Sequence, residues 1–299
     1  MKIGAFEIQE PLPEAKDIHA IGMLRPWVDA GSVATIALTR LERHLGAQEI
    51  GKLARPGTFF DFTRYRPLTH EVDGKRVFTL PNSNIYFVHR PEGASFLLLH
   101  LLEPHAFAED YIDSIVQLLN AFKVKRYCRL GGMYDVVPHT RPLLVSGAAG
   151  SKPLEGVGGV IFRQRRPYQG PTSIMGLITG ELEKSNIENM NLMVHLPQYV
   201  ELEEDYTGAS RLLEILCSIY NLPAELSSSE EGQRQYREIN SKVDQNPAAK
   251  AFVKRLEADY DAQVASGAYP SSFQDAAPPL SPQLQDFLEQ LGKQLDNPS

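Results

Sequence analysis

The feature that most constrains the fold is an apolar run at residues 95–102, with the sequence SFLLLHLL. Its length suits a β-strand, and its lack of polar alternation predicts a strand buried on both faces. Residues 109–122 follow, with apolar side chains three and four positions apart, which predicts an amphipathic helix. The next apolar segment, 125–130, again has strand length. A strand, a helix and a strand in this order predict a βαβ unit with parallel strands, and therefore an α/β fold.

Similar patterns extend this α/β body over about residues 1–222. Ser32 and Ser173 stand where a side-chain hydroxyl would cap a following helix. Residues 75–80 and 84–89 follow each other closely and predict a hairpin. Other strands are expected at 3–8, 59–62, 142–146, 159–162 and 191–196, and other helices at 33–46, 174–182 (with Leu177 on the inward face) and 209–220.

The character of the chain changes after residue 222. Residues 224–262 show no strand pattern and predict two charged helices. Ser281 opens a last short helix with Leu284, Leu288 and Leu291 on one side. Because such a helix is too short to be stable alone, it is expected to dock on its own body or on a neighbouring subunit, or to stay partly disordered. The expected domains are an α/β domain over 1–222, a helical extension over 223–264, and a linker with the short helix over 265–299.

Composition and charge exclude several classes of function. The chain has 30 Lys and Arg against 37 Asp and Glu, a net charge of −7, which argues against nucleic-acid or anionic-membrane binding. Residues 1–10 are too acidic for an export signal, and no apolar run approaches the ~20 residues of a membrane span. Cys128 and Cys217 fit neither a metal spacing nor a disulfide framework. They predict buried free thiols in a reducing cytoplasm, with a nucleophilic Cys128 as the alternative.

Polar side chains follow the predicted parallel strands at three places. The carboxyl ends of parallel strands meet at one edge of a sheet, so these groups are expected to converge there. A carboxylate, an imidazole and a guanidinium at that edge could bind an anion or move a proton. In the alternative, Arg141 pairs with Glu103 or Asp135 and only fastens the loop. The candidate ligand-binding residues are Glu103, Gly131, Gly132, Asp135, His139, Arg141, His195 and Tyr199.

Signatures of other chemistries are missing from the sequence. His100 and His105 have no second ligand pair at zinc spacing. The glycines of 147–159 match neither phosphate-binding motif. Ser146 precedes Gly147 but lacks the strand–elbow–helix context of a nucleophilic serine. No metal, no cofactor and no catalytic residue is therefore expected.

Five short runs occur in a recognisable order along the chain. They are Glu103-Pro104, Gly131-Gly132, PHTRP at 138–142, GPTS at 170–173 and HLPQY at 195–199. On these runs, over roughly residues 20–260, the chain resembles the bacterial branch of the proteasome assembly chaperone family. The resemblance implies a three-layer α/β/α body similar to nucleoside phosphorylases and peptidyl hydrolases, without their catalytic machinery. It also implies a helical C-terminal segment and self-association, with a trimer among the arrangements.

Three hypotheses for function stay open at this point. The favoured one is a cytoplasmic binding or assembly protein that forms homo-oligomers, has a protein partner and turns over no substrate. The second is an enzyme or sensor for a small anion, such as a nucleotide or sugar phosphate, held by Arg141. The third is a scaffold whose polar cluster is only structural. Some eukaryotic and archaeal members engage proteasome α-subunits through a hydrophobic-Tyr-x tail, which residues 295–299 do not match, so that contact is not predicted.

Overall fold

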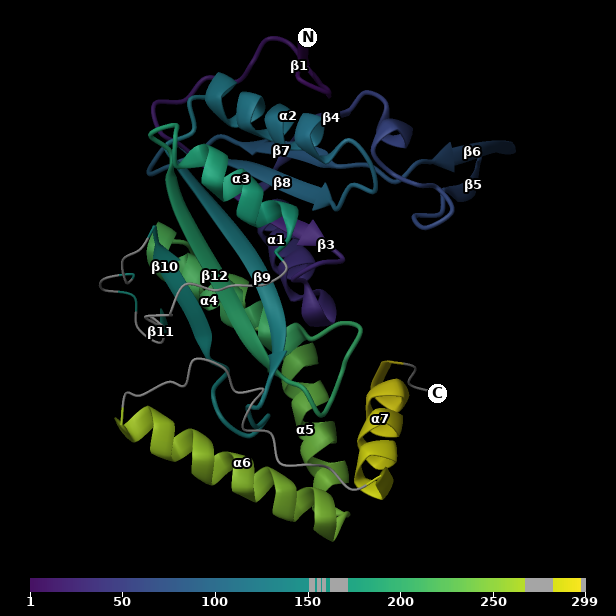
Figure 1. Cartoon of the computed structure of the whole chain (residues 1–299), viewed down its shortest axis with the longest axis vertical. Helices are drawn as coiled ribbons and strands as arrows, with labels where there is room; N and C mark the ends of the chain where they lie inside the picture. Colours follow the sequence, from purple (N-terminus) through teal and green to yellow (C-terminus); the bar gives the residue numbers. More distant parts are fainter. Residues whose placement is uncertain (151–153, 155–156, 158–159, 162–171, 267–281, 297–299) are drawn as a thin grey trace. The chain divides into compact units, whose positions relative to one another are not determined.

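The computed structural model describes the chain except for residues 151–153, 155–156, 158–159, 162–171, 267–281 and 297–299 (Figure 1). The chain forms two compact units, and each unit is made of three separate segments. Unit 1 comprises residues 1–27, 42–129 and 170–190, and unit 2 comprises residues 28–41, 130–169 and 191–299. Most of the expected 265–280 linker, and part of the 159–162 and 170–173 segments, lie outside the described residues.

Unit 1 is built on a mixed sheet with the order β1-β2-β4-β7-β8-β3-β9. Neighbours are antiparallel from β1 to β8, whereas β3 is parallel to both β8 and β9. The strands of the predicted βαβ unit therefore do run in the same direction, but β3, which was not predicted, lies between them. The bounds are β1 (Lys2–Ile3), β2 (Phe6–Ile8), β3 (Ile18–Arg25), β4 (Gln48–Leu53), β7 (Asn84–Val88), β8 (Ser95–Leu102) and β9 (Arg126–Asp135).

The hydrophobic core of unit 1 lies between this sheet and two helices, α2 (Ala108–Ala121) and α3 (Ile174–Leu182). The central strand β8 is buried along nearly its whole length, as its apolar run predicts. α2 and α3 lie side by side, and their buried side chains belong to the same cluster as those of β7 and β8 (Figure 1). Leu177 of α3, expected to face inward, is 52% exposed, and Ser173 makes no capping hydrogen bond with its side chain.

Two expected strands of unit 1 differ from the structure. Residues 59–62 form no strand; they follow the short helix η2 (Pro56–Thr58), and the rings of Phe59 and Phe60 pack against Tyr111. The strand β6 (Lys75–Thr79) pairs not with β7 but with β5 (Leu68–Val72), in a separate two-stranded sheet. The aromatic side chains at 59–62 give the sequence pattern of a strand, although they reach the core from a turn.

Unit 2 continues two of the strands. β9 passes into it after Arg129, and β12 (Glu188–Pro197) passes into it after Met190. The strand order in this unit is β9-β12-β10-β11, with β10 at Val145–Ala149 and β11 at Val160–Ile161. The first part of α1 (Val33–Leu45) and the whole of α4 (Tyr206–Tyr220) belong to unit 2.

The N-termini of both helices are capped by buried aspartates. The Asp29 carboxylate accepts the backbone N–H groups of Ala34 at 2.7 Å and Thr35 at 3.3 Å, which is the role predicted for Ser32. Asp205 accepts the N–H of Gly208 at 2.7 Å. Such caps satisfy donors that the helix itself leaves open.

The C-terminal extension is helical, as expected. It contains η3 (Ala224–Ser227), α5 (Glu230–Asp244), α6 (Pro247–Ser266) and α7 (Pro282–Asp296). The apolar side of α7 docks on its own unit: Leu284, Leu288 and Leu291 are buried in one cluster with residues 199–202 and with α5 and α6. The mixed α/β fold with a helical C-terminal extension is thus confirmed. No described helix has both the length and the apolar character that a bilayer crossing needs.

Candidate functional site

A row of three side chains crosses neighbouring strands in unit 2. Asp135 ends β9, His195 lies on β12 and Ser146 lies on β10, and β12 is the middle strand of the three. Nδ1 of His195 lies 2.6 Å from Oδ2 of Asp135, and Nε2 lies 2.9 Å from Oγ of Ser146. His195 and Asp135 are buried, whereas Ser146 is partly exposed. The structure brings two predicted site residues into contact and adds Ser146, which the missing elbow motif had set aside.

His139 and Tyr199 form a second buried pair. The Tyr199 hydroxyl accepts the backbone N–H of His139 at 2.8 Å and lies 2.6 Å from Nδ1 of the same residue. Burial lowers the pKa of His139 to about 4, with partial opposition from the Glu257 carboxylate, and burial raises the pKa of Tyr199. His139 is therefore neutral near pH 7, so it brings no positive charge to an anion.

Arg141 is engaged by two carboxylates of α6. Its Nε and Nη2 atoms donate to the two oxygens of Asp261 at 2.9 and 2.8 Å, and Nη1 donates to Glu257 at 3.1 Å. The hydrogen bonds to Asp261 are the main cause that raises the pKa of Arg141. The partners proposed from the sequence, Glu103 and Asp135, are not the ones it uses. Its guanidinium fastens the β9–β10 connection to α6, which weakens its assignment as an anion ligand.

Gly131 and Gly132 lie inside β9 and not in a turn. A Cβ on Gly131 would lie 2.8 Å from the carbonyl oxygen of Val28, and a Cβ on Gly132 would lie 2.9 Å from that of Ala30. The Gly132 N–H donates to the Val28 carbonyl at 2.8 Å. These glycines allow the segment before α1 to lie directly on the strand, which is a packing role.

Glu103 belongs to unit 1, whereas the other seven candidates belong to unit 2. Its backbone carbonyl accepts the Tyr65 hydroxyl at 3.1 Å, and burial raises the pKa of its carboxyl group. It lines a cavity of about 670 Å³ together with Phe59, Asp61 and His105. Its neighbours therefore belong to unit 1, whereas the polar row belongs to unit 2.

A cavity of about 480 Å³ opens beside His139 in unit 2. Thr207 and Tyr236 line it, together with the cations Arg141 and Arg211. Arg211 donates to the Leu143 carbonyl at 3.0 Å, and Arg141 is bonded to α6 as described above. Arg211 also forms an ion pair with Glu214, which lines the same cavity. Because both cations are paired with carboxylates, the cavity has weak electrostatic attraction for a small anion.

The cysteines are buried and free, as expected. Burial raises the pKa of the Cys128 thiol to about 12, so it holds almost no thiolate near pH 7. The nucleophilic alternative for Cys128 is therefore not supported. Across the described part of the chain, no three His, Cys, Asp or Glu side chains gather in a way that could hold a metal ion.

A surface that was not predicted stands out in unit 1. The hairpin β5–β6, here called the arm, has every residue of both strands exposed and reaches away from β4, β7 and β8 (Figure 1). Leu68, Val72 and Val77 are 43 to 58% exposed. The signal for the hairpin was present in the Asp73-Gly74 pair, whose two positive φ angles are those of a tight hairpin turn.

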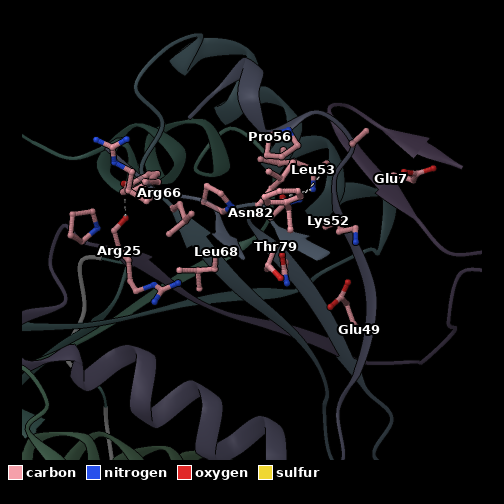
Figure 2. A pocket seen from close by; sticks show the side chains of 18 residues that line it. Glu7, Arg25, Glu49, Lys52, Leu53, Pro56, Arg66, Leu68, Thr79 and Asn82 are labelled. Atoms are coloured by element: carbon pink, nitrogen blue, oxygen red, sulfur yellow. Dashed lines mark hydrogen bonds between the residues drawn. The ribbon is translucent and has the colours of Figure 1, made fainter. Parts of the chain in front are cut away.

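A cavity of about 900 Å³ lies at the base of the arm (Figure 2). Leu68, Phe78 and Leu80 supply apolar lining. Figure 2 shows Arg25 and Arg66 on one side of the view and Glu7 and Glu49 on the other, with Lys52 near the acidic residues. A groove with apolar lining and both signs of charge suits a protein surface better than a small molecule of one charge.

Comparisons with known proteins give consistent results. A sequence model described as the PAC2 family matches residues 23–245. A Mycobacterium tuberculosis protein of unknown function is similar in structure, with a TM-score of 0.75, 22% identity and 98% of each chain covered. No protein among the curated sequences gives a significant match.

Two further solved structures are similar to this chain, and their names refer to the PAC2 family or to proteasome assembly. A PAC2 family protein from Streptomyces avermitilis has a TM-score of 0.68 and 22% identity, covering 80% of this chain and 99% of its own. A Mycobacterium tuberculosis proteasome-assembly chaperone homologue has a TM-score of 0.67 and 23% identity, covering 79% of this chain and 99% of its own. At these identities the structural neighbours establish the shared fold.

Proposed function

Since the chain belongs to the PAC2 family, we propose that its main role is to associate with other protein chains as an assembly-type binding protein. A solved neighbour that is named a proteasome-assembly chaperone homologue supports this class of role. The observation that carries the proposal is the arm, a hairpin whose apolar side chains, Leu68, Val72, Val77 and Phe78, are 43 to 64% exposed. We further propose that the arm is covered by a second copy of the same chain.

The register of the arm places three of its apolar side chains on one face and Phe78 on the other. Leu68 pairs with Thr79, His70 with Val77, and Val72 with Lys75. Directly paired residues and every second residue share a face of a hairpin, so Leu68, Val72 and Val77 lie together. Thr69 and Phe78 are paired on the opposite face.

Physical arguments favour a protein as the occupant of this face. An isolated two-stranded hairpin is marginally stable in water, so the arm gains stability when a further surface covers it. Each of its strands also has an outer edge with backbone groups able to pair with another strand.

A second copy is the partner that suits the arm and its groove. The arm carries Glu71 and Arg76 as well as apolar groups, and the groove at its base carries both charge signs. Such surfaces are complementary to each other across copies, and identical chains are the commonest partners in soluble assemblies.

Sedimentation velocity of the full chain tests the proposal. Wild type is expected to sediment as an oligomer, and Val77→Asp as a lighter species, because a carboxylate on the covered face would lose its hydration. Gln117→Glu adds the same charge on the exposed side of α2, outside the arm and its groove, and should sediment like wild type. A monomeric wild type at every concentration would overturn the proposal, and so would a Val77→Asp protein that associates as well as wild type.

We also propose that the protein acts in the cytoplasm. The support is the pair of buried free thiols at Cys128 and Cys217, which are compatible with a reducing compartment. Fractionation of cells that express the chain, followed by detection with an antibody, tests this location. Recovery with secreted or membrane fractions would contradict it.

A further inference from the structure

The row formed by Asp135, His195 and Ser146 has the connectivity of a nucleophile, a base and an orienting carboxylate. The imidazole stands between the other two, with one ring nitrogen turned to each. The two distances, 2.6 and 2.9 Å, lie within hydrogen-bond reach. From this geometry we propose that Ser146 is the nucleophile of an acyl-ester hydrolase site, with His195 as its general base. This activity goes beyond the assembly role, which needs no chemistry.

The carboxylate sets the tautomer of the imidazole. Oδ1 of Asp135 accepts the backbone N–H of Val136 at 2.8 Å, while Oδ2 faces Nδ1 of His195. An ionised carboxylate only accepts hydrogen bonds, so the proton of the neutral imidazole belongs on Nδ1. Nε2 is then an acceptor, and the Ser146 hydroxyl donates to it. This is the arrangement in which a serine proton can leave toward histidine.

The strands hold the three groups in place without a nucleophile elbow. The backbone N–H of His195 donates to the Leu144 carbonyl at 2.9 Å, which ties β12 to the segment that leads into Ser146. The N–H of Gln198 donates to the Asp135 carbonyl at 3.0 Å, which ties the end of β12 to the end of β9. The backbone therefore supplies the rigidity that a reactive geometry needs.

Burial differs along the row in a way that suits catalysis. The side chain of His195 is 0% exposed and that of Asp135 is 2% exposed, so water competes little for their hydrogen bond. Ser146 is partly exposed, so its end of the row is the one that a substrate would reach.

The order of the groups in the row indicates the substrate class. A hydroxyl, an imidazole and a carboxylate that are hydrogen-bonded in this order are the groups that carry out acyl transfer in serine hydrolases. We therefore assign acyl esters as the substrate class.

The reaction balances with water as the only co-reactant. Oγ of Ser146 attacks the ester carbonyl carbon while its proton passes to Nε2 of His195. The bond from the carbonyl carbon to the leaving oxygen breaks, and His195 returns the proton to that oxygen, which releases an alcohol. Water then attacks the acyl-serine with His195 as base. This step releases a carboxylic acid and restores the Ser146 hydroxyl.

A fluorophosphonate probe tests the proposal on the full chain, because it reacts with activated serines. Intact mass and peptide mapping of wild type are expected to show one adduct at Ser146, and Ser146→Ala should lose it. Ser227→Ala removes another partly exposed serine of unit 2 and should label like wild type. A purified serine hydrolase in parallel confirms that the probe is active.

Asp135→Asn separates a positioning role from a structural one. The amide keeps the shape of the side chain but no longer favours the required tautomer. Labelling of Ser146 and kcat for p-nitrophenyl butyrate should fall by about 100-fold or more, with KM and the thermal midpoint close to wild type.

Two results would overturn the assignment. One is a folded wild type with no adduct at Ser146 while the control enzyme labels. The other is an Asp135→Asn protein that labels as fast as wild type. In either case the row is a structural hydrogen-bond network. Both outcomes leave the sedimentation test of the assembly role unaffected.

Discussion

Burial sets the charge of single residues in this protein, and His139 is the clearest case. Its folded pKa of about 4 lies below the ordinary value of 6.5 because the side chain is removed from water. The unfolded chain therefore binds a proton at a pH where the folded chain does not. The stability that this difference contributes is complete above pH 6.5 and is lost as the pH falls toward 4.

His139→Asn is expected to reduce the pH dependence of stability. Asparagine does not titrate, so the free energy of unfolding should fall less in the variant than in wild type between pH 7.5 and 4.5, by about 2.5 kcal/mol. Urea unfolding at both pH values measures this difference. The comparison at pH 7.5 serves as the control for any direct cost of the substitution. Parallel losses in the two proteins would show that His139 is not protonated on unfolding in this range.

Arg141 should act locally, through the contact with α6. Arg141→Gln removes the fork that holds Asp261 and Glu257, so the backbone amides of α6 are expected to exchange hydrogen faster, while those of α2 in unit 1 stay unchanged. Hydrogen exchange followed by mass spectrometry measures both helices. Arg234→Gln, an exposed change of the same charge on α5, is the matched control. Equal exchange of α6 in both variants would mean that the fork does not hold the helix.

The residues of the candidate site were only partly predictable from the sequence. The chemical types at Asp135, His139, His195 and Tyr199 mark them as candidates in the sequence, yet their pairing depends on which strands become neighbours. Ser146 was set aside because a motif search recognises the elbow of one fold and not a contact across three strands. The engagement of Arg141 with Asp261 joins residues 120 positions apart and has no local pattern.

Local sequence patterns are sufficient to predict three helices of this chain, but not to predict two of its strands. α1, α2 and α4 carry continuous apolar stripes and were predicted within a few residues. β3 was missed because His19 and Gly22 interrupt its apolar run, although it is the parallel neighbour of β8. β6 was given the wrong partner because pairing depends on the turn at Asp73-Gly74 as much as on apolar alternation.

The docking of α7 can be tested by opening a cavity beneath it. Leu288 is 2% exposed, so Leu288→Ala should lower the free energy of unfolding by about 2–5 kcal/mol, as other large-to-small core changes do. Urea unfolding followed by circular dichroism measures the change. Asp286→Ala on the exposed side of the same helix should change stability little. A Leu288→Ala protein as stable as wild type would show that α7 contributes nothing to unit 2.

For the whole molecule, association through the arm predicts that stability depends on protein concentration. A partner that binds only the folded chain stabilises it, by about 1.4 kcal/mol for each tenfold rise in concentration above the dissociation constant. The thermal midpoint of wild type should therefore rise with protein concentration, and that of Val77→Asp should not. Calorimetry over a hundredfold range of concentration measures both. A wild-type midpoint that does not depend on concentration would contradict association in the folded state.

The alternation of the two units along the chain has a consequence for synthesis. Six segments belong to them in turn, so the polypeptide crosses from one to the other five times, and unit 1 lacks its last segment until residue 190 has been translated. Residues 28–41 leave the ribosome long before the strands that receive them. Neither unit can therefore mature on an early nascent chain, and a gene fragment that stops before codon 190 would encode two unfinished bodies rather than one finished body.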